Sequence, residues 1–479
     1  MGQGAVTAIV FGNVSSPGET GRTSKSRLIN CILEQLQDGS TNHKRAPGLK
    51  RFITSAGGNA HTRGMIAANS NTLLVVYNGK VESVSYSAGA TISSVGGTLS
   101  GTDLVTLARN NAATPDIVCV SPANGAFTIN AAGAVSAYPD ADVGAPNSVC
   151  FGDGYFFFTY GDGSCIASGL NSTSINVLDS IKAESQSGPI LRGVFYRGLL
   201  FLFTPSTTEV WQDTANPTGF PFSRSAVIPR GLMSANAVAG WEDRFPAQLM
   251  WVGPDNIVYK MVGYEPVRIS THDVEHDLQS LADKTEVRCF VAKNNGHPFF
   301  YVKSSEFTWA YDLLTSTWQE RHSYGLTRWR GEQSCFMWDD WVIGDELTGY
   351  GFRLDNRTYA EDTSVLVWDV TSQPAKGFPN RYAVARADFD FVAGMGVTGG
   401  DPNQEGDPQV MVSWSDDGGA TFNYPLMRRL GKAGRYGERV TVLRAGQATS
   451  YGRQWRLQIS DPVYVGLLGG DMSAEARLP

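Results

Sequence analysis

Short runs of aromatic and β-branched residues alternate with turn residues along most of this chain. The pattern is clearest from Leu249 to Asp355, in LMWVGPDNIVYKMVGYEPVRIST, GHPFFYVKSSEFTWAYDLLTSTWQER and SCFMWDDWVIGDELTGYGFRLD. Runs of this length, cut by Gly, Asn, Asp and Ser, predict short β-strands. Groups of such strands that repeat about every 40 to 50 residues are typical of a β-propeller. We therefore predict an all-β fold whose main part is a propeller.

The same pattern begins at about residue 53, and turn sequences mark its hairpins. Asn78-Gly79 and Asn124-Gly125 are strong hairpin signals, because the favoured two-residue turn needs positive φ. Glycines around Asp153 and Asp162, and the pair Arg197-Gly198, predict further turns. The strand groups centre near Leu73, Ile117, Cys150, Phe195, Leu249, Phe299 and Phe336. Because the intervals vary, we predict six to seven blades.

The first 52 residues do not fit the blade pattern, and we treat 1–52 as an N-terminal arm. Within SKSRLINCILEQLQDG, four apolar residues fall at helical spacing: Leu28, Ile32, Leu33 and Leu36. Asp38-Gly39 follows as a stop signal, so we predict a short helix here. Two roles stay open for the arm: it completes a blade of the propeller, or it reaches a neighbouring molecule.

The composition changes again at about residues 356 to 382. After it, ADFDFVAG, PQVMVSWSDDGGATF and RQWRLQISDPVYVGLLGG predict longer antiparallel strands. We therefore predict a propeller over 53–379 and a β-sandwich-like domain over 380–479. One further helix is predicted from His272 to Lys284, with Val274, Leu278 and Leu281 on one face, in a connection between blades.

Composition and charge narrow the classes of function. The 479 residues are 42% hydrophobic and 18% charged, the balance of a folded chain rather than a disordered one. The net charge of −7 argues against a dedicated DNA-binding protein, which normally carries a basic patch. The negative charge does not argue against a protein that DNA only moves past.

No targeting segment or disulfide framework is predicted. The N-terminus lacks the basic region of a signal peptide, and no window of about 18 apolar residues predicts a transmembrane helix. Six cysteines occur without a C-x-x-C pair, and we expect buried thiols in a reducing compartment, with a Cys150–Cys165 bond left open.

One segment resembles the Asp-box of sialidases and related propellers. Its S-x-D-x-G-x-T-F pattern is formed by Ser415, Asp417, Gly419, Thr421 and Phe422. Physically the pattern suits a hairpin turn, in which the carboxylate accepts turn amides and Gly takes a conformation that a side chain would obstruct. We expect a structural turn rather than a hydrolytic site. Tyr311-Asp312 and Trp318 similarly resemble a kelch-type hairpin with a cross-strand aromatic pair.

Catalytic and metal motifs are weak or missing, so we expect no enzyme activity, no cofactor and no metal. Asp140-x-Asp142-x-Gly144 has the start of a calcium loop but lacks its distal Glu. His272 and His276 have the i, i+4 spacing of zinc ligands, but the motif is H-D-V-E-H and no third ligand is evident. We interpret both as solvated surface residues.

A basic stretch in the last hundred residues is the remaining candidate site. It consists of Arg428, Arg429, Lys432, Arg435 and Arg439, interleaved with glycines. We predict either a contact with a polyanion or another subunit, or a solvated loop.

Several short segments occur in an order that resembles one known family. They are EVW at 209–211, PF at 221–222, IPRGL at 228–232, RIST at 268–271, GHPFF at 296–300, then WAYDLLTSTW, WVIGDELTG and SDDGG, with APGLKRF near the N-terminus. In this order they resemble the packaged-DNA stabilisation protein of short-tailed bacteriophages, the tail hub or nozzle protein. The resemblance is weakest from 80 to 190.

This resemblance implies a structural role in the virion tail. It implies a ring of six copies around the tail axis, an adaptor–portal connector above, a tail needle or plug below, and fibres or spikes at the side. Such a protein is made in the host cytoplasm, closes the DNA channel after packaging and later lets the genome out. The acidic charge fits, because a wall that bound DNA tightly would resist its passage.

Two alternatives to this structural role stay open at this point. One is a carbohydrate-binding or adhesion propeller. The other is a sialidase-like propeller, which would need Asp-boxes on successive blades and an Arg cluster, whereas the sequence holds one clear box in its last domain.

Overall fold

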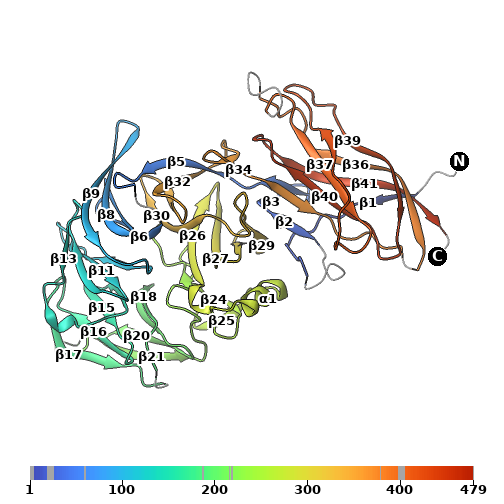
Figure 1. The fold of residues 1–479 in the computed structure, drawn as a ribbon. Coiled ribbons are helices and arrows are strands. Elements are labelled where there is room, and N and C mark those ends of the chain that lie inside the picture. Colours follow the sequence, from blue (N-terminus) through green and yellow to red (C-terminus); the bar gives the residue numbers. More distant parts are fainter. Residues whose placement is uncertain are drawn as a thin grey trace.

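The structure is a computed structural model that describes residues 5–18, 26–58, 61–185, 188–214, 216, 219–377, 379–397 and 405–477. Across these residues the fold is almost entirely β, with one α-helix, α1 (His272–Ser280). Figure 1 shows a ring of small sheets on one side and a layered β-domain on the other, with both chain ends at the far end of the layered domain. The predicted all-β class is confirmed.

The ring is a seven-bladed propeller, counted over the described residues, and six blades are four-stranded antiparallel meanders. Their strands are β6 (Thr62–Ala67), β7 (Thr72–Tyr77), β8 (Gly79–Ser87) and β9 (Ala90–Leu99); β10 (Thr106–Arg109), β11 (Ile117–Ser121), β12 (Gly125–Ile129) and β13 (Val135–Ala137); β14 (Ser148–Gly152), β15 (Tyr155–Thr159), β16 (Ser164–Ser168) and β17 (Ile175–Lys182); β18 (Arg192–Tyr196), β19 (Leu199–Phe203), β20 (Thr208–Asp213) and β21 (Phe222–Ile228); β22 (Val238–Ala239), β23 (Met250–Val252), β24 (Val258–Val262) and β25 (Glu265–Arg268); β26 (Arg288–Asn294), β27 (His297–Lys303), β28 (Thr308–Asp312) and β29 (Thr317–Glu320).

The seventh blade is completed by the N-terminal part of the chain. It comprises β30 (Gly331–Met337), β31 (Asp340–Asp345) and β32 (Tyr350–Asp355), with β5 (Gly48–Thr54) paired antiparallel to β32. Leu49 and Ile53 of β5 are fully buried, so the strand is held by packing as well as by its ladder. Inner strand β30 then contacts inner strand β6, which closes the ring. The short strands β33 (Ala360–Glu361) and β34 (Ser364–Val365) extend this sheet.

The sequence predictions for the propeller agree with these elements. Each of the seven predicted centres falls in a different blade, or directly beside its strand. The Asn78-Gly79 and Asn124-Gly125 turns join β7 to β8 and β11 to β12, and Gly79 and Gly125 have φ of 77° and 90°, a conformation in which a side chain would be strained.

The layered domain is a sandwich of two sheets around a separate core. One sheet holds β3 (Cys31–Gln35), β4 (Thr41–Arg45), β41 (Gly466–Arg477), β36 (Arg381–Phe391) and β39 (Val440–Ala448), with β1 (Ala5–Ala8) also paired to β41. The other holds β35 (Trp368–Thr371), β40 (Gln454–Ile459), β37 (Gln409–Ser415) and β38 (Leu426–Arg429). Trp368, Phe389 and Trp455 are fully buried between the sheets.

One three-residue strand, β2 (Arg27–Ile29), joins the propeller to the sandwich. It pairs parallel with β29 of the sixth blade and antiparallel with β35 of the sandwich. The sixth blade and one sandwich sheet thus form a continuous nine-stranded sheet. In Figure 1 the N-terminal strands lie among the C-terminal strands of the sandwich before the chain enters the propeller through β5.

The short helix predicted around Leu28 to Leu36 is wrong, because this segment forms β2 and β3. The first two residues of the SKSRLINCILEQLQDG segment, 24 and 25, lie outside the described residues. In β3 burial alternates, with Cys31 and Leu33 inward and Glu34 partly exposed, which is a strand period. Pairing with β4, β29 and β35 outweighs the weak helical spacing.

The second predicted helix is present as α1, which ends at Ser280, before the predicted end at Lys284. The division into 1–52, 53–379 and 380–479 stays a proposal, since β5 and β35 each belong to a sheet across one of these borders. All six cysteines are free thiols, and Cys150 and Cys165 are not bonded. Among the described residues, none of the helices has the length and apolarity that crossing a membrane requires.

Candidate functional site

The junction between propeller and sandwich concentrates buried polar contacts, and Arg27 and Glu320 lie at its centre. The Arg27 guanidinium donates through Nε at 3.0 Å and Nη2 at 2.7 Å to the two carboxylate oxygens of Glu320. The Ser15 hydroxyl donates to the same carboxylate at 2.6 Å. Burial would raise the pKa of Glu320, but the charge and hydrogen bonds of Arg27, with His322 nearby, lower it to about 2.

Asn30 fastens the same junction through its side chain. Its Nδ2 donates to the carbonyl oxygens of His322 and Val367, both at 2.8 Å, and its Oδ1 accepts the His322 N–H at 3.1 Å. Its φ of 52° is one that Asn tolerates better than most residues. One side chain thus bridges the propeller and the segment that leads into the sandwich.

Arg45, at the end of β4, is a buried cation that binds only main-chain oxygens. Its two terminal nitrogens donate to the carbonyl oxygens of Leu366, Ile459, Asp461 and Val463 at 2.5 to 3.0 Å. It therefore holds the segment between β34 and β35 against the end of β40. The N-terminal segment is also held on α1, since the Ser16 hydroxyl and the Gly18 N–H donate to Asp273 at 2.9 and 2.8 Å.

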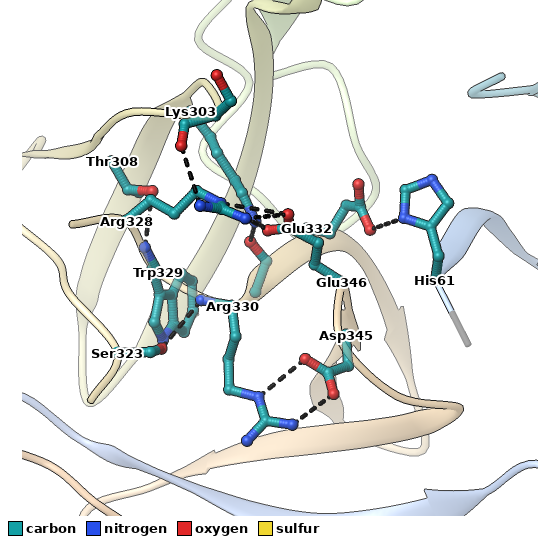
Figure 2. A network of polar contacts seen from close by, with 12 residues as sticks. His61, Lys303, Thr308, Ser323, Arg328, Trp329, Arg330, Glu332, Asp345 and Glu346 are labelled. Carbon is teal, nitrogen blue, oxygen red and sulfur yellow. Dashed lines mark hydrogen bonds and ion pairs between the residues drawn. The ribbon is translucent and has the colours of Figure 1, made fainter. Parts of the chain in front are cut away.

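A second polar network closes the propeller ring, and Figure 2 shows it from close by. Glu332 of β30 is fully buried, and its carboxylate oxygens lie 2.5 Å from the guanidinium of Arg288 on β26 and 2.7 Å from the ring nitrogen Nδ1 of His61. His61 directly precedes β6. Because these residues belong to the sixth, seventh and first blades, Glu332 connects the three blades at the point where the ring closes.

The network also includes residues of the sixth and seventh blades and of the connection between them. Lys303 is fully buried, and its Nζ donates to Glu346 at 2.7 Å and to the Gly331 carbonyl at 2.9 Å. Arg328 donates to the same Glu346 carboxylate at 2.7 Å, and Arg330 pairs with buried Asp345 at 2.5 Å (Figure 2). Burial would raise the pKa of Glu346, but the hydrogen bonds and charges of Arg328 and Lys303 lower it to about 2.

The Asp-box-like segment forms a tight turn after β37. Asp417 accepts the Ser415 hydroxyl at 2.6 Å, and its two oxygens accept the Thr421 N–H at 3.0 Å and the Thr421 hydroxyl at 2.5 Å. The Gly419 N–H donates to Ser415 Oγ at 2.8 Å, and Gly419 has φ of 93°. Phe422 lies beneath Arg456, 5.4 Å from its guanidinium. The carboxylate of Asp417 and the hydroxyl groups of Ser415 and Thr421 are thus hydrogen-bonded within the turn itself.

The basic stretch lies on and after β38 and is largely exposed. Arg429 and Lys432 face Asp407 at 3.5 and 3.9 Å, and Arg435 faces Glu438 at 3.6 Å. Arg428 differs, because its Nε donates to the Thr441 carbonyl at 2.8 Å across to the other sheet. Arg439 is exposed. The stretch begins six residues after Phe422, so it follows the Asp-box-like turn closely in the chain and continues to the start of β39.

Two further predicted motifs form contacts that stabilise a strand pair and a turn. Tyr311 and Trp318 are cross-strand partners on β28 and β29 with ring centroids 5.0 Å apart, as predicted for the kelch-like hairpin. Asp140 accepts the N–H groups of Asp142 and Ile175 at 3.1 and 2.8 Å. Among the described residues, no group of three His, Cys, Asp or Glu side chains is placed to hold a metal ion.

The junction and closure networks were missed by sequence reasoning. Arg27 and Glu320 are 293 residues apart, and a single sequence cannot pair them. The sequence did hold one sign of these networks. Glu320 and Glu332 stand inside or directly after predicted strands, where burying a carboxylate without a partner would cost free energy, so each residue calls for a cationic or hydrogen-bonding partner.

Comparisons with known proteins agree with this two-part architecture. A family model described as bacteriophage P22 Gp10, beta-propeller, matches residues 29–359, and one described as bacteriophage P22 Gp10, beta-sandwich, matches residues 378–475. A comparison with curated protein sequences found no match.

Two solved structures show low similarity to this chain. The WD40 beta propeller domain of Doa1 is 10% identical, with a TM-score of 0.43 over 64% of this chain and 98% of that chain. PorZ, a surface component of the type-IX secretion system of Porphyromonas gingivalis, is 11% identical, with a TM-score of 0.38 over 71% of this chain and 44% of that chain. These values carry no functional argument, whereas the family models cover both the propeller and the sandwich. The chain therefore belongs to the bacteriophage P22 Gp10 family, whose members are structural tail hub proteins of the virion.

Proposed function

We propose that this chain forms the hub, or nozzle, of a short-tailed phage tail, below the portal–adaptor connector. In this role it closes the DNA channel after packaging and allows the genome to leave during infection. The observation that carries the proposal is the family match over both the propeller and the sandwich. The alternative of a carbohydrate-binding or sialidase-like propeller has no comparable support.

The proposed partners follow from this position in the tail. We expect a sixfold ring of copies, contacts with the adaptor above and with a tail needle or plug below, fibres or spikes at the side, and phage DNA in the lumen. The exposed end of the sandwich with Arg429, Lys432 and Arg435 is a proposed contact with a polyanion or a neighbouring subunit. No enzymatic step, cofactor or metal is part of the proposal, and synthesis takes place in the host cytoplasm.

The junction between propeller and sandwich is suited to transmit force. A hub that holds packaged DNA must transmit force between the parts that contact different partners. Here the backbone ladder runs from the sixth blade through β2 into the sandwich, and side-chain hydrogen bonds of Arg27, Asn30 and Arg45 hold it in place. Such a junction resists bending better than a flexible linker, which lacks cross-strand bonds.

The test is a comparison of phage particles assembled with and without this chain. Particles that lack it should package DNA and then lose it, and addition of the purified protein should restore nuclease-resistant DNA. Protein that carries Arg27→Met and Asn30→Ala together is the matched variant, because it keeps both cores but weakens their junction. Retention of DNA in particles that lack the chain would overturn the proposal.

A further inference from the structure

A cavity of about 410 Å³ lies along the axis of the propeller. Inner strands β6, β10, β14, β18 and β30 form its wall, together with residues 241–243 after β22. Its size is near the lower end of the range for small-molecule sites. The family match describes the propeller but assigns nothing to this cavity.

Arg192, at the start of β18, brings a cation to the cavity wall without a protein partner. Its Nε and Nη1 are buried and donate no hydrogen bond to any of the described residues. None of the carboxylates in the described chain lies within ion-pair distance of it; the aromatic ring it faces is Trp241, at 5.8 Å. Buried guanidinium groups normally have hydrogen-bond acceptors, so this one is an exception that requires a ligand or water.

The charges that face Arg192 leave the cavity positive. Glu242 is the carboxylate nearest in the wall, and its Oε2 accepts the Gly240 N–H at 2.6 Å. Burial raises the pKa of Glu242 to about 7, so a large part of it is neutral at physiological pH. Arg109 of β10 adds a second cation to the wall, and Asp243 is exposed.

The thiols around the cavity do not offset this charge. Burial raises the pKa of both Cys150 and Cys335 to about 12, so both are neutral near pH 7. The cavity therefore presents a desolvated guanidinium and a second arginine to whatever enters it.

We propose that the axial cavity binds a small oxyanion, a phosphate or a carboxylate, through Arg192. A guanidinium donates to such groups through two parallel N–H groups, and charge-assisted hydrogen bonds of this kind are strong. The bound anion would lie between the blades that carry Arg109, Arg192 and Glu242 and would tie them together. The inference is independent of the proposed tail function.

Thermal unfolding of the full chain tests the site, with inorganic phosphate and acetate as probes against chloride at equal ionic strength. Phosphate stabilises many proteins by exclusion, so the quantity compared is the extra rise in Tm of the wild type over Arg192→Gln. We expect an extra rise of about 2–4 °C at saturation in phosphate, in acetate or in both, which also separates the two ligand classes. Arg381→Gln, an exposed arginine of the sandwich, should behave as the wild type.

Glu242→Gln gives a second variant that leaves Arg192 in place. Removal of the facing carboxylate should keep or increase the rise in Tm. In chloride, Arg192→Gln should unfold at or above the wild-type Tm, because it loses an uncompensated buried charge. Equal anion-dependent rises in the wild type and in Arg192→Gln would overturn the proposal, as would loss of the rise in Glu242→Gln.

Discussion

The guanidinium of Arg27 grips both carboxylate oxygens of Glu320, at 3.0 and 2.7 Å, although the two residues are 293 positions apart in the chain. Backbone pairing between their strands, β2 and β29, consists of the single pair Ile29↔Glu320. The side-chain contact therefore supplements a very short ladder at the place where, in the described part of the chain, the propeller sheet continues into the sandwich. Because so few contacts join the two sheets here, mutations at the junction are the first to test.

Arg27→Met should destabilise the protein. It leaves the Glu320 carboxylate, which is 7% exposed, without its cation. We expect a loss on the order of 3 kcal/mol in the free energy of unfolding, the lower end for breaking a buried pair, because the Arg27 side chain is 43% exposed and partly screened. Urea denaturation measures it. Arg386→Gln, which breaks the solvated pair with Asp388, should cost below about 1 kcal/mol, and equal losses in the two variants would contradict the prediction.

The protein should lose stability in mild acid. In the folded chain the pKa of both Glu320 and Glu346 is about 2, below the ordinary value of 4.5. A carboxylate with a depressed folded-state pKa contributes stability that is complete above about pH 4.5 and is lost as the pH falls toward 2. The urea midpoint should therefore fall between pH 6 and pH 3. Glu346→Gln should show a shallower fall than the wild type, and a midpoint that does not change with pH would exclude this origin.

Glu332→Gln should weaken the closure of the propeller ring. The neutral amide leaves Arg288, whose side chain is 15% exposed, without its counter-charge, and it also replaces the carboxylate that contacts His61. We expect a cost of about 3–5 kcal/mol and faster hydrogen exchange in β6 and β30, which meet at the closure. Glu34→Gln is the control, because its pair with Lys44 is solvated and should be worth below about 1 kcal/mol. Unchanged exchange in β6 and β30 would show that the network is not needed for closure.

Asp417→Ala should loosen the turn between β37 and β38 without affecting distant parts. The change removes the acceptor of the Ser415 hydroxyl and of two groups of Thr421. A loss of about 1–3 kcal/mol is expected for these unsatisfied groups, with the increase in hydrogen exchange confined to the β37–β38 hairpin. Asp390→Ala, on the exposed side of β36, should change stability by less than about 0.5 kcal/mol. A global increase in exchange would contradict a local turn role.

The blades could be predicted from the sequence because their information is local. Turn residues such as Gly79 and Gly125 and the period of the strands between them determine each hairpin without reference to distant parts of the chain. Leu28 to Leu36 was misassigned because its apolar residues fit a helix about as well as a strand. Pairing with β4, β29 and β35, the last two nearly 300 residues or more away, decides the outcome. The ion pairs of Glu320 and Glu332 could not be predicted for the same reason, because their partners lie far away in the chain.

Electron cryomicroscopy of the tail of the phage that encodes this chain would show directly where the protein lies. We expect six copies of the propeller and sandwich around the tail axis, directly below the connector, with the DNA channel passing through the ring. Within each copy, the density should run continuously from the sixth blade through β2 into the sandwich. Density for the chain only at the fibres or in the head, with none around the channel, would contradict the assignment as a tail hub.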